Sequence, residues 1–281
     1  MSALSLLARL GLTASATKAR QPSQFFMLAL SALMLVFAAQ PLLLYLAPVV
    51  DLSEAMKDSP TLTTYRQPED GKPFFAERMS RAPGLYGGLH AIPAIIWSIG
   101  IPMQHSARLR SSYRTLHRWV GRATLLSAVI LNITGLLFIP LNLSYSIKTF
   151  ELHEWSGLKW PSFNAAVVLV GVAWPATTLM AWKTARAKQW DQHRRWATVH
   201  TAFGYVITLQ RIGLLLVGFV GTIASLSPAL SQALHIPHHS VGAEAFEKER
   251  AAFALGTWLM IPWTGVWLFH LFPASHTHKT A

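Results

Sequence analysis

The chain has 281 residues, 52% of them hydrophobic and only 13% charged, whereas about 25% of residues are charged in an ordinary soluble domain. This composition excludes a soluble globular protein and predicts a polytopic membrane protein. The net charge is +12, but no basic helix with interleaved aromatic residues points to nucleic acid. Because the chain has no cysteine, it can hold no disulfide, iron–sulfur cluster or thiolate-based zinc site.

Six segments are apolar and long enough to cross the ~30 Å hydrocarbon core of a membrane as helices. We expect one transmembrane domain over 24–273, an all-α polytopic bundle, between a basic tail at 1–23 and a short tail at 274–281. The second to fifth spans should form a four-helix core, with the first and sixth beside it. In chain order, the predicted spans are 25–50, 85–104, 119–141, 164–182, 196–222 and 251–273.

The distribution of Lys and Arg predicts which ends of the spans share a side of the membrane. Two turns, between the second and third and between the fourth and fifth spans, are strongly basic. With both tails they hold 14 basic residues and one acidic residue, against nine basic and 11 acidic residues in the other three loops. Both termini and both basic turns are therefore expected on the cytoplasmic or matrix side. The basic turns contain Arg108, Arg110, Arg114, Arg118 and Arg122, and Lys183, Arg186, Lys188, Arg194 and Arg195.

The amino-terminal tail allows two interpretations. It contains three basic residues and many small or hydroxylated ones, and no acidic residue precedes Asp51. This composition is typical of a mitochondrial presequence, which would place the protein in the mitochondrial inner membrane. It is also typical of a short cytoplasmic tail that obeys the positive-inside rule.

A stripe of polar residues follows the fifth span. On a helix turning ~100° per residue, His193, His200 and Arg211 return to within ~20° of one line. A charge deep in a span is costly unless it faces the bundle interior and finds a partner. Since the predicted spans contain no Asp or Glu, Arg211 should pair with backbone carbonyls, with Gln210 or Tyr205, or with an anionic ligand, unless it only snorkels.

Histidines on several spans suggest a b-type haem. Imidazole is the usual axial ligand of such haems, and histidine pairs on facing helices of a bundle build their sites. The candidate ligands are His90, His117, His193 and His200, and neighbouring arginines could pair with the haem propionates. These arginines are Arg118, Arg122, Arg194 and Arg195. As an alternative, histidines at headgroup level are solvated or bind lipid phosphate.

Three stretches resemble a known family. They are LHAIPAIIWSIGIPMQ with His90, HRWVGR with His117, and DQHRRW with His193, followed by LQR ending at Arg211. They resemble an uncharacterised family of multi-pass membrane proteins found in bacteria and fungi. The resemblance implies a membrane bundle with these four residues at characteristic positions, and it implies no substrate or activity. It does not extend to His200, where the family has a small polar residue.

The sequence leaves two functional classes open. The first is a redox bundle, either a b-type cytochrome or a quinone-reactive protein. The second is a non-catalytic scaffold, lipid-binding or assembly protein that would bind anionic lipid at its basic turns. We identify no catalytic residue and no metal site, because the chain lacks a phosphate loop, a GxSxG serine and a zincin motif. Cation-coupled transport is disfavoured because it needs a buried carboxylate.

The charge distribution generates a topology prediction. Single cysteines placed in this cysteine-free chain at Ser112 and at Ser53 should react with a membrane-impermeant maleimide from opposite sides of the membrane. The measurement compares labelling of intact and permeabilised cells or vesicles. Labelling of both positions from one side would contradict the six-span threading.

Overall fold

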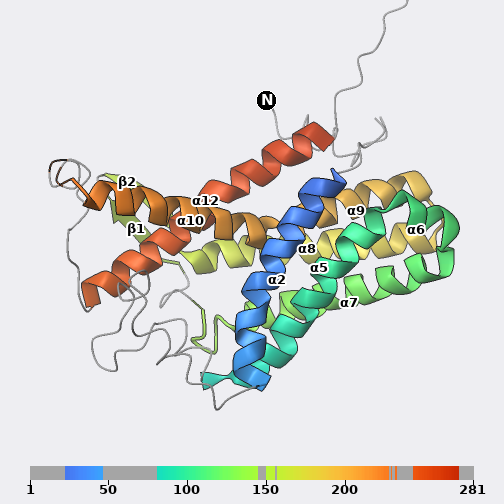
Figure 1. Ribbon diagram of the computed structural model, residues 1–281, viewed down its shortest axis with the longest axis horizontal. Helices are drawn as coiled ribbons and strands as arrows, with labels where there is room; N and C mark the ends of the chain where they lie inside the picture. The colour runs from blue at the N-terminus through green and yellow to red at the C-terminus, as the bar shows by residue number, and fades with distance from the viewer. Residues whose placement is uncertain are drawn as a thin grey trace, which may run out of the picture.

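The computed structural model describes residues 23–46, 81–144, 150–155, 157–227, 229, 232 and 243–271. Among these residues, six helical stretches are long and apolar enough to span a membrane. Figure 1 shows how the helices are arranged. The predicted all-α, multi-pass bundle is confirmed. Most of both tails and most of the first loop lie outside the described residues.

Each predicted span corresponds to one helix or to two consecutive helical segments. The second span joins a π-helix to an α-helix, and the fifth is interrupted at Tyr205. In chain order the segments are α2 (Gln24–Leu46), η2 (Gly84–Ala91), α5 (Ile92–His105), α6 (Ala107–Ser112), α7 (Arg114–Leu137), α8 (Phe163–Arg186), α9 (Trp190–Gly204), α10 (Val206–Ser225) and α12 (Ala243–Leu271).

The third and fifth helices begin earlier than the predicted spans. Helix α7 starts at Arg114 rather than at residue 119, and α9 starts at Trp190 rather than at residue 196. Hydropathy marks where hydrocarbon begins, but backbone hydrogen bonding continues through the headgroup region, where long basic side chains reach water. As a consequence, His117 and His193 lie on helices rather than in loops.

A short β-hairpin precedes α8, in a segment that we expected to be a loop without strands. Strand β1 (Leu152–Trp155) pairs antiparallel with β2 (Leu158–Pro161), and Gly157 has a positive φ of 79° in the turn. Ser162 follows, and its Oγ accepts a hydrogen bond from the Ala165 backbone N–H at 3.3 Å, which caps α8. Four-residue strands are too short to show a clear alternation in sequence.

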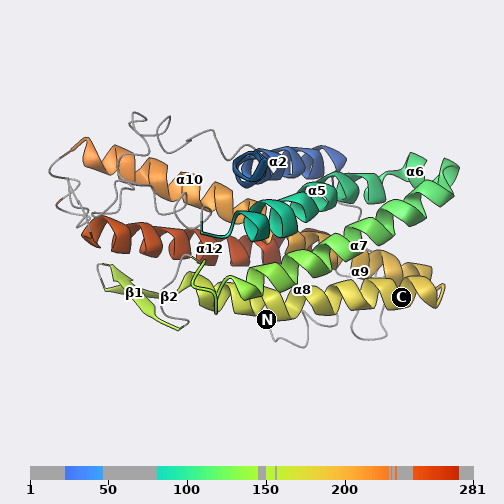
Figure 2. The ribbon, with the colours of Figure 1, turned by 90° about the horizontal axis from the view of Figure 1, so that it is seen from below.

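The helices alternate in direction, which defines two ends of the bundle (Figures 1 and 2). We call the end formed by residues 105–118 and 183–195 the basic end, and the opposite end, with β1 and β2, the hairpin end. The Gln24 side-chain amide donates to the Pro102 carbonyl at 3.0 Å, and the Phe26 and Trp267 rings lie 5.2 Å apart. These contacts bring the start of α2 and the end of α12 toward the basic end.

All six spans contribute to the buried core. Helix α2 inserts Met27 and Ser31, and the Ser31 Oγ lies 2.6 Å from the Ser98 carbonyl oxygen and 2.7 Å from the Tyr205 hydroxyl. Helix α12 packs along α10 and adds Met260 to the same apolar cluster. The first and sixth helices are thus part of the core, in addition to the four that we expected to form it.

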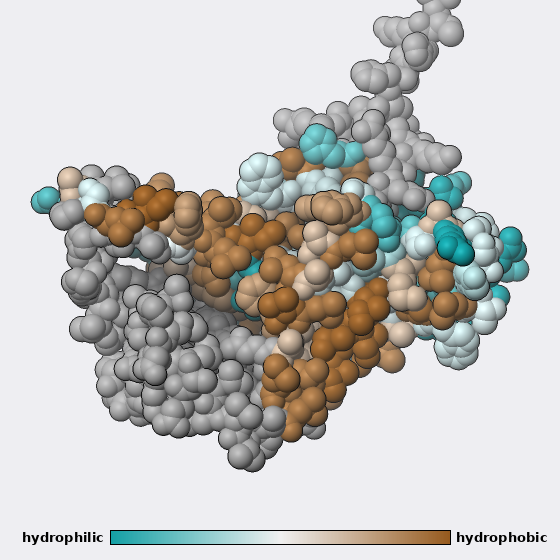
Figure 3. Space-filling model, viewed as in Figure 1, coloured by the Kyte–Doolittle hydropathy of each residue, from teal (hydrophilic) through white to brown (hydrophobic). Residues whose placement is uncertain are grey.

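The lateral surface of the bundle is apolar. Many large hydrophobic side chains point outward, for example Val172, which is 70% exposed, and Phe219, which is 64% exposed. Figure 3 shows apolar residues over the helices and hydrophilic ones gathered around α6 at the basic end. Exposed apolar area of this extent would be unfavourable in water and fits contact with lipid.

Close packing of α10 on α12 depends on Gly213 and Gly256, which face each other across the two helices. A Cβ on Gly256 would lie 2.9 Å from the Leu214 backbone nitrogen, closer than such atoms approach. We expect Gly256→Ala to force the helices apart and to lower the free energy of unfolding by about 1–3 kcal/mol. Thermal unfolding in detergent measures this. Gly265→Ala on α12 is the matched control because its Cβ would meet nothing within 4 Å, and equal melting of the two variants would contradict the close packing.

Candidate functional site

Three histidines meet at the basic end, from three different helices. His105 ends α5, His117 lies in the first turn of α7, and His193 lies in the first turn of α9. The imidazoles of His117 and His193 are close enough to each other and to His105 for their charges to interact. We call these three residues the histidine cluster. The structure therefore brings together two of the predicted ligands and adds His105, which we had not selected.

Helix packing orients His193. Its Nδ1 lies 2.9 Å from the Ala181 carbonyl oxygen on α8. Because a carbonyl can only accept, Nδ1 carries the proton, and the neutral ring keeps a lone pair on Nε2. Fixing one ring nitrogen in this way is how proteins usually orient a histidine that binds a metal through the other nitrogen.

The other two cluster histidines also retain binding capacity. The Nε2 of His105 lies 2.8 Å from the Thr201 hydroxyl oxygen, and that hydroxyl donates to its own helix, at the Ala197 carbonyl. His105 is thus the donor, and its Nδ1 keeps the lone pair. The Nδ1 of His117 is buried, and no hydrogen-bond partner for it is present in the part of the chain that the structure describes.

The predicted arginines are spread around this end. Arg194 interacts electrostatically with His193, and Arg195 is buried on α9. Arg118 and Arg122 are exposed on α7, where the Arg122 guanidinium lies 4.9 Å from the centre of the Trp119 ring. A further arginine, Arg110 on α6, interacts electrostatically with His105 and His117. Arg194, one of the four selected arginines, thus lies close enough to a cluster histidine to interact electrostatically.

His200 is buried in the middle of the bundle, and both of its ring nitrogens are in use. The Trp97 indole N–H donates to Nε2 at 3.2 Å, so Nε2 holds no proton. The protonated Nδ1 then donates to the Thr178 hydroxyl at 3.1 Å, and that hydroxyl donates to the Trp174 carbonyl at 3.0 Å. The ring also stacks on Trp174, with centroids 5.6 Å apart. In this arrangement His200 has no lone pair available for iron.

His90 lies toward the hairpin end, on the π-helix. Its Nδ1 is 2.7 Å from the Thr134 hydroxyl, which itself donates to the Ile130 carbonyl, so His90 is the donor and Nε2 keeps the lone pair. The ring packs 4.9 Å from Phe138. His90 precedes His105 by fifteen residues on the same span, about 20 Å at ~1.5 Å per residue. It is therefore not part of the histidine cluster.

Arg211 contacts aromatic rings. Its guanidinium carbon lies 5.3 Å from the ring centres of Phe37 on α2 and Phe253 on α12. It also interacts electrostatically with His90. Aromatic faces attract cations by about 0.5–2 kcal/mol, more strongly where water is excluded. Tyr205 is one of the side chains that we expected beside Arg211. Its hydroxyl lies against Ser31 and donates a hydrogen bond to the Met27 carbonyl at 3.0 Å.

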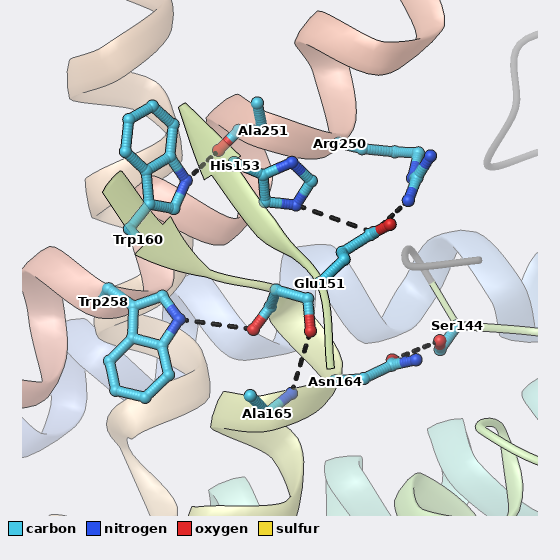
Figure 4. Close-up of polar contacts among 10 residues, drawn as sticks. Ser144, Glu151, His153, Trp160, Asn164, Ala165, Arg250, Ala251 and Trp258 are labelled. Atoms are coloured by element: carbon cyan, nitrogen blue, oxygen red, sulfur yellow. Dashed lines mark hydrogen bonds and ion pairs between the residues drawn. The ribbon is translucent and has the colours of Figure 1, made fainter. Parts of the chain in front are cut away.

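A second polar cluster joins the hairpin to α12, as Figure 4 shows. The Arg250 guanidinium pairs with the Glu151 carboxylate, and His153 Nε2 lies 3.8 Å from the same carboxylate oxygen. The Trp160 indole donates to the Ala251 carbonyl at 3.0 Å. Arg250 is only 2% exposed, so this ion pair is shielded from water and ties the loop after α7 to the last helix. Sequence reasoning had treated these residues as loop charges.

The described residues offer no ready metal site, since no three His, Asp or Glu side chains among them are grouped to hold an ion. Comparisons of the chain with protein-family models, with curated proteins and with solved structures find no match. The resemblance to a multi-pass family therefore stays a prediction. Among the described residues, the histidine cluster is the candidate site because it brings three imidazoles from three helices to one end of the bundle.

The network around His200 generates a stability prediction. His200→Leu leaves the Trp97 indole N–H buried without its acceptor, which should lower the free energy of unfolding by roughly 1–3 kcal/mol. Thermal unfolding in detergent would measure the loss. Adding Trp97→Phe removes the orphaned donor, so the double variant should lose less than the sum of the single variants. Strict additivity would show that the two side chains are not coupled.

Proposed function

We propose that this protein is a haem-binding redox bundle, with a b-type haem at the basic end between α7 and α9. In this proposal the imidazoles of His117 and His193 would hold the haem iron. The observation that supports it is that α7 and α9 both begin at the basic end, where the two imidazoles are close enough to interact electrostatically. Haem sites in helix bundles are built from such side chains on facing helices.

The hydrogen bonding of His193 supports its role as a ligand. With Nδ1–H held by the Ala181 carbonyl, the ring has a fixed orientation and a more basic Nε2, which favours binding to iron. For His117, the buried Nδ1 has no hydrogen-bond partner in the described part of the chain. Rotation of this ring to bind a ligand would therefore break no hydrogen bond of Nδ1 to a described residue. His105 stands beside both rings as a positioning residue or an alternative ligand.

Charge supports the same location. A haem brings two propionates, and this end of the bundle presents Arg110 and Arg194 beside the histidines. Arginine binds carboxylates through two parallel hydrogen bonds, which adds geometric specificity. Asp191 is the one acidic residue in the two basic turns and tails, and it lies 3.9 Å from Arg194. The positive charge at this end of the bundle therefore favours the anionic propionate groups of a haem.

A non-catalytic scaffold or lipid-binding protein is the alternative proposal. The packed interior supports it, because Trp97, Trp174, His200 and Tyr205 fill the middle of the bundle with satisfied side chains. Under this alternative, the histidine cluster is only part of a basic headgroup-level surface. The two proposals differ in one observable property, which is the visible spectrum of the purified protein.

The haem proposal predicts a Soret band in protein purified from haem-replete cells, with a reduced-minus-oxidised spectrum typical of two imidazole ligands. His193→Ala and His117→Ala should each abolish most of this absorbance per mole of protein. A pyridine haemochrome assay measures the haem content directly. His270→Ala, which changes an exposed histidine on the last turn of α12, is the matched control and should keep the band.

Two further variants sharpen the assignment. His200→Leu should retain the band, since both nitrogens of that ring are already bonded within the protein. If His105→Ala abolishes the band while His117→Ala keeps it, the ligand pair is His105 with His193. A colourless parent protein would contradict the haem proposal and favour the scaffold.

A further inference from the structure

A cleft of about 690 Å³ opens on the surface where α6 turns into α7. It is lined by the polar residues Ser111 and Ser112 and by Arg114. The apolar residues Leu116 and Trp119 line it as well, and Trp119 is 62% exposed. The lining of the cleft therefore combines polar and basic residues with apolar ones.

A second hollow, of about 220 Å³, lies between α5 and α7. Its walls are apolar and include Ile96 and Ile99 on α5 and Val120 and Ala123 on α7. Thr124 also lines it, but its hydroxyl donates to the Val120 carbonyl of its own helix at 2.8 Å. This hollow thus offers a groove that suits a hydrocarbon chain.

The two hollows share one face of α7. At ~100° per residue, Leu116, Val120 and Ala123 fall within about 60° of one another, so residues that line the two hollows lie on one face of α7. The polar, basic cleft and the apolar groove thus follow one another along this face of the helix.

The charge around the cleft has one sign. Arg114 lines it, and Arg118 lies one turn along α7, where its Nε donates to the Arg114 carbonyl at 3.3 Å. The Arg122 guanidinium lies over the ring of Trp119, which lines the same cleft. The basic turn that contains these residues includes no Asp or Glu, so the ligand that complements it is an anion.

We propose that these two hollows form a binding site for one anionic phospholipid. The phosphate headgroup occupies the cleft beside Arg114 and the serine hydroxyls, and an acyl chain follows the groove between α5 and α7. Trp119 lies at the boundary, where its amphipathic ring suits the membrane interface. A free phosphate would use only the cleft, whereas a lipid uses both hollows, and for that reason we assign the site to a lipid. This proposal goes beyond the redox function and needs no haem.

The test measures lipid retention by the full-length protein in nanodiscs. The protein is placed in nanodiscs of phosphatidylcholine with one-tenth phosphatidylglycerol, then extracted, and its bound lipid is counted by native mass spectrometry. The parent should retain phosphatidylglycerol in preference to phosphatidylcholine. Arg114→Gln should weaken retention of phosphatidylglycerol about tenfold, as expected for the loss of one charge-assisted hydrogen bond. Ala123→Phe, which fills the groove, should weaken retention of both lipids.

The matched control is Arg186→Gln. Arg186 lies 5.2 Å from the Trp182 ring at the same end of the bundle, so this pair resembles Arg122 and Trp119 but stands away from the cleft. The Arg186→Gln variant should retain as much lipid as the parent, and added inorganic phosphate should displace no lipid. Equal losses in Arg114→Gln and Arg186→Gln, parent-like retention in Arg114→Gln, or displacement by phosphate would each overturn the proposal. The absorbance spectrum is recorded on the same samples, so failure of the lipid site and failure of the haem site are distinguishable.

Discussion

The hydrogen bond from the Trp97 indole to His200 is the contact on which the middle of the bundle depends. It joins α5 to α9. The same imidazole also donates a hydrogen bond to the Thr178 hydroxyl on α8. In a low-dielectric interior, a polar group without a partner is expensive, so this network accepts only one relative placement of the three helices. The neighbouring contact between Tyr205 and Ser31 adds α2 to the same arrangement.

The relative placement of these helices determines which side chains lie at the basic end. With α5 and α9 locked at His200, His105 and His193 follow at the ends of the same helices, and α7 packs along α5 to bring His117 beside them. The positions of the three cluster histidines therefore depend on the buried network around His200. A site built on helix ends rather than on loops is held with little freedom, as ligand positioning requires. The satisfied His200 acts as a support for the histidines that keep a free ring nitrogen.

The sequence predicted those features that depend on a single helix. Apolar length and charge predicted six spans, and a spacing of seven residues placed His193 and His200 on one stripe. Sequence reasoning missed His105, because the predicted span stopped at residue 104. It also missed Trp97 as the donor to His200, since periodicity shows which face of a helix is polar but not which residue of another helix meets it. The aromatic rings around Arg211 come from α2 and α12, far away in the chain.

The predicted spans contain no carboxylate, so the histidines within them have no acidic partner on those segments. A buried carboxylate needs a cation or several donors, whereas a neutral imidazole can be buried with one hydrogen bond and still keep a lone pair. His90 and His193 both follow this pattern, each with Nδ1 held by a neighbouring helix. Such rings are oriented without carrying charge into the hydrocarbon. A neutral imidazole with one nitrogen fixed is the usual form of a metal-binding histidine, which is why the histidine cluster, rather than Arg211, is the centre of the functional proposal.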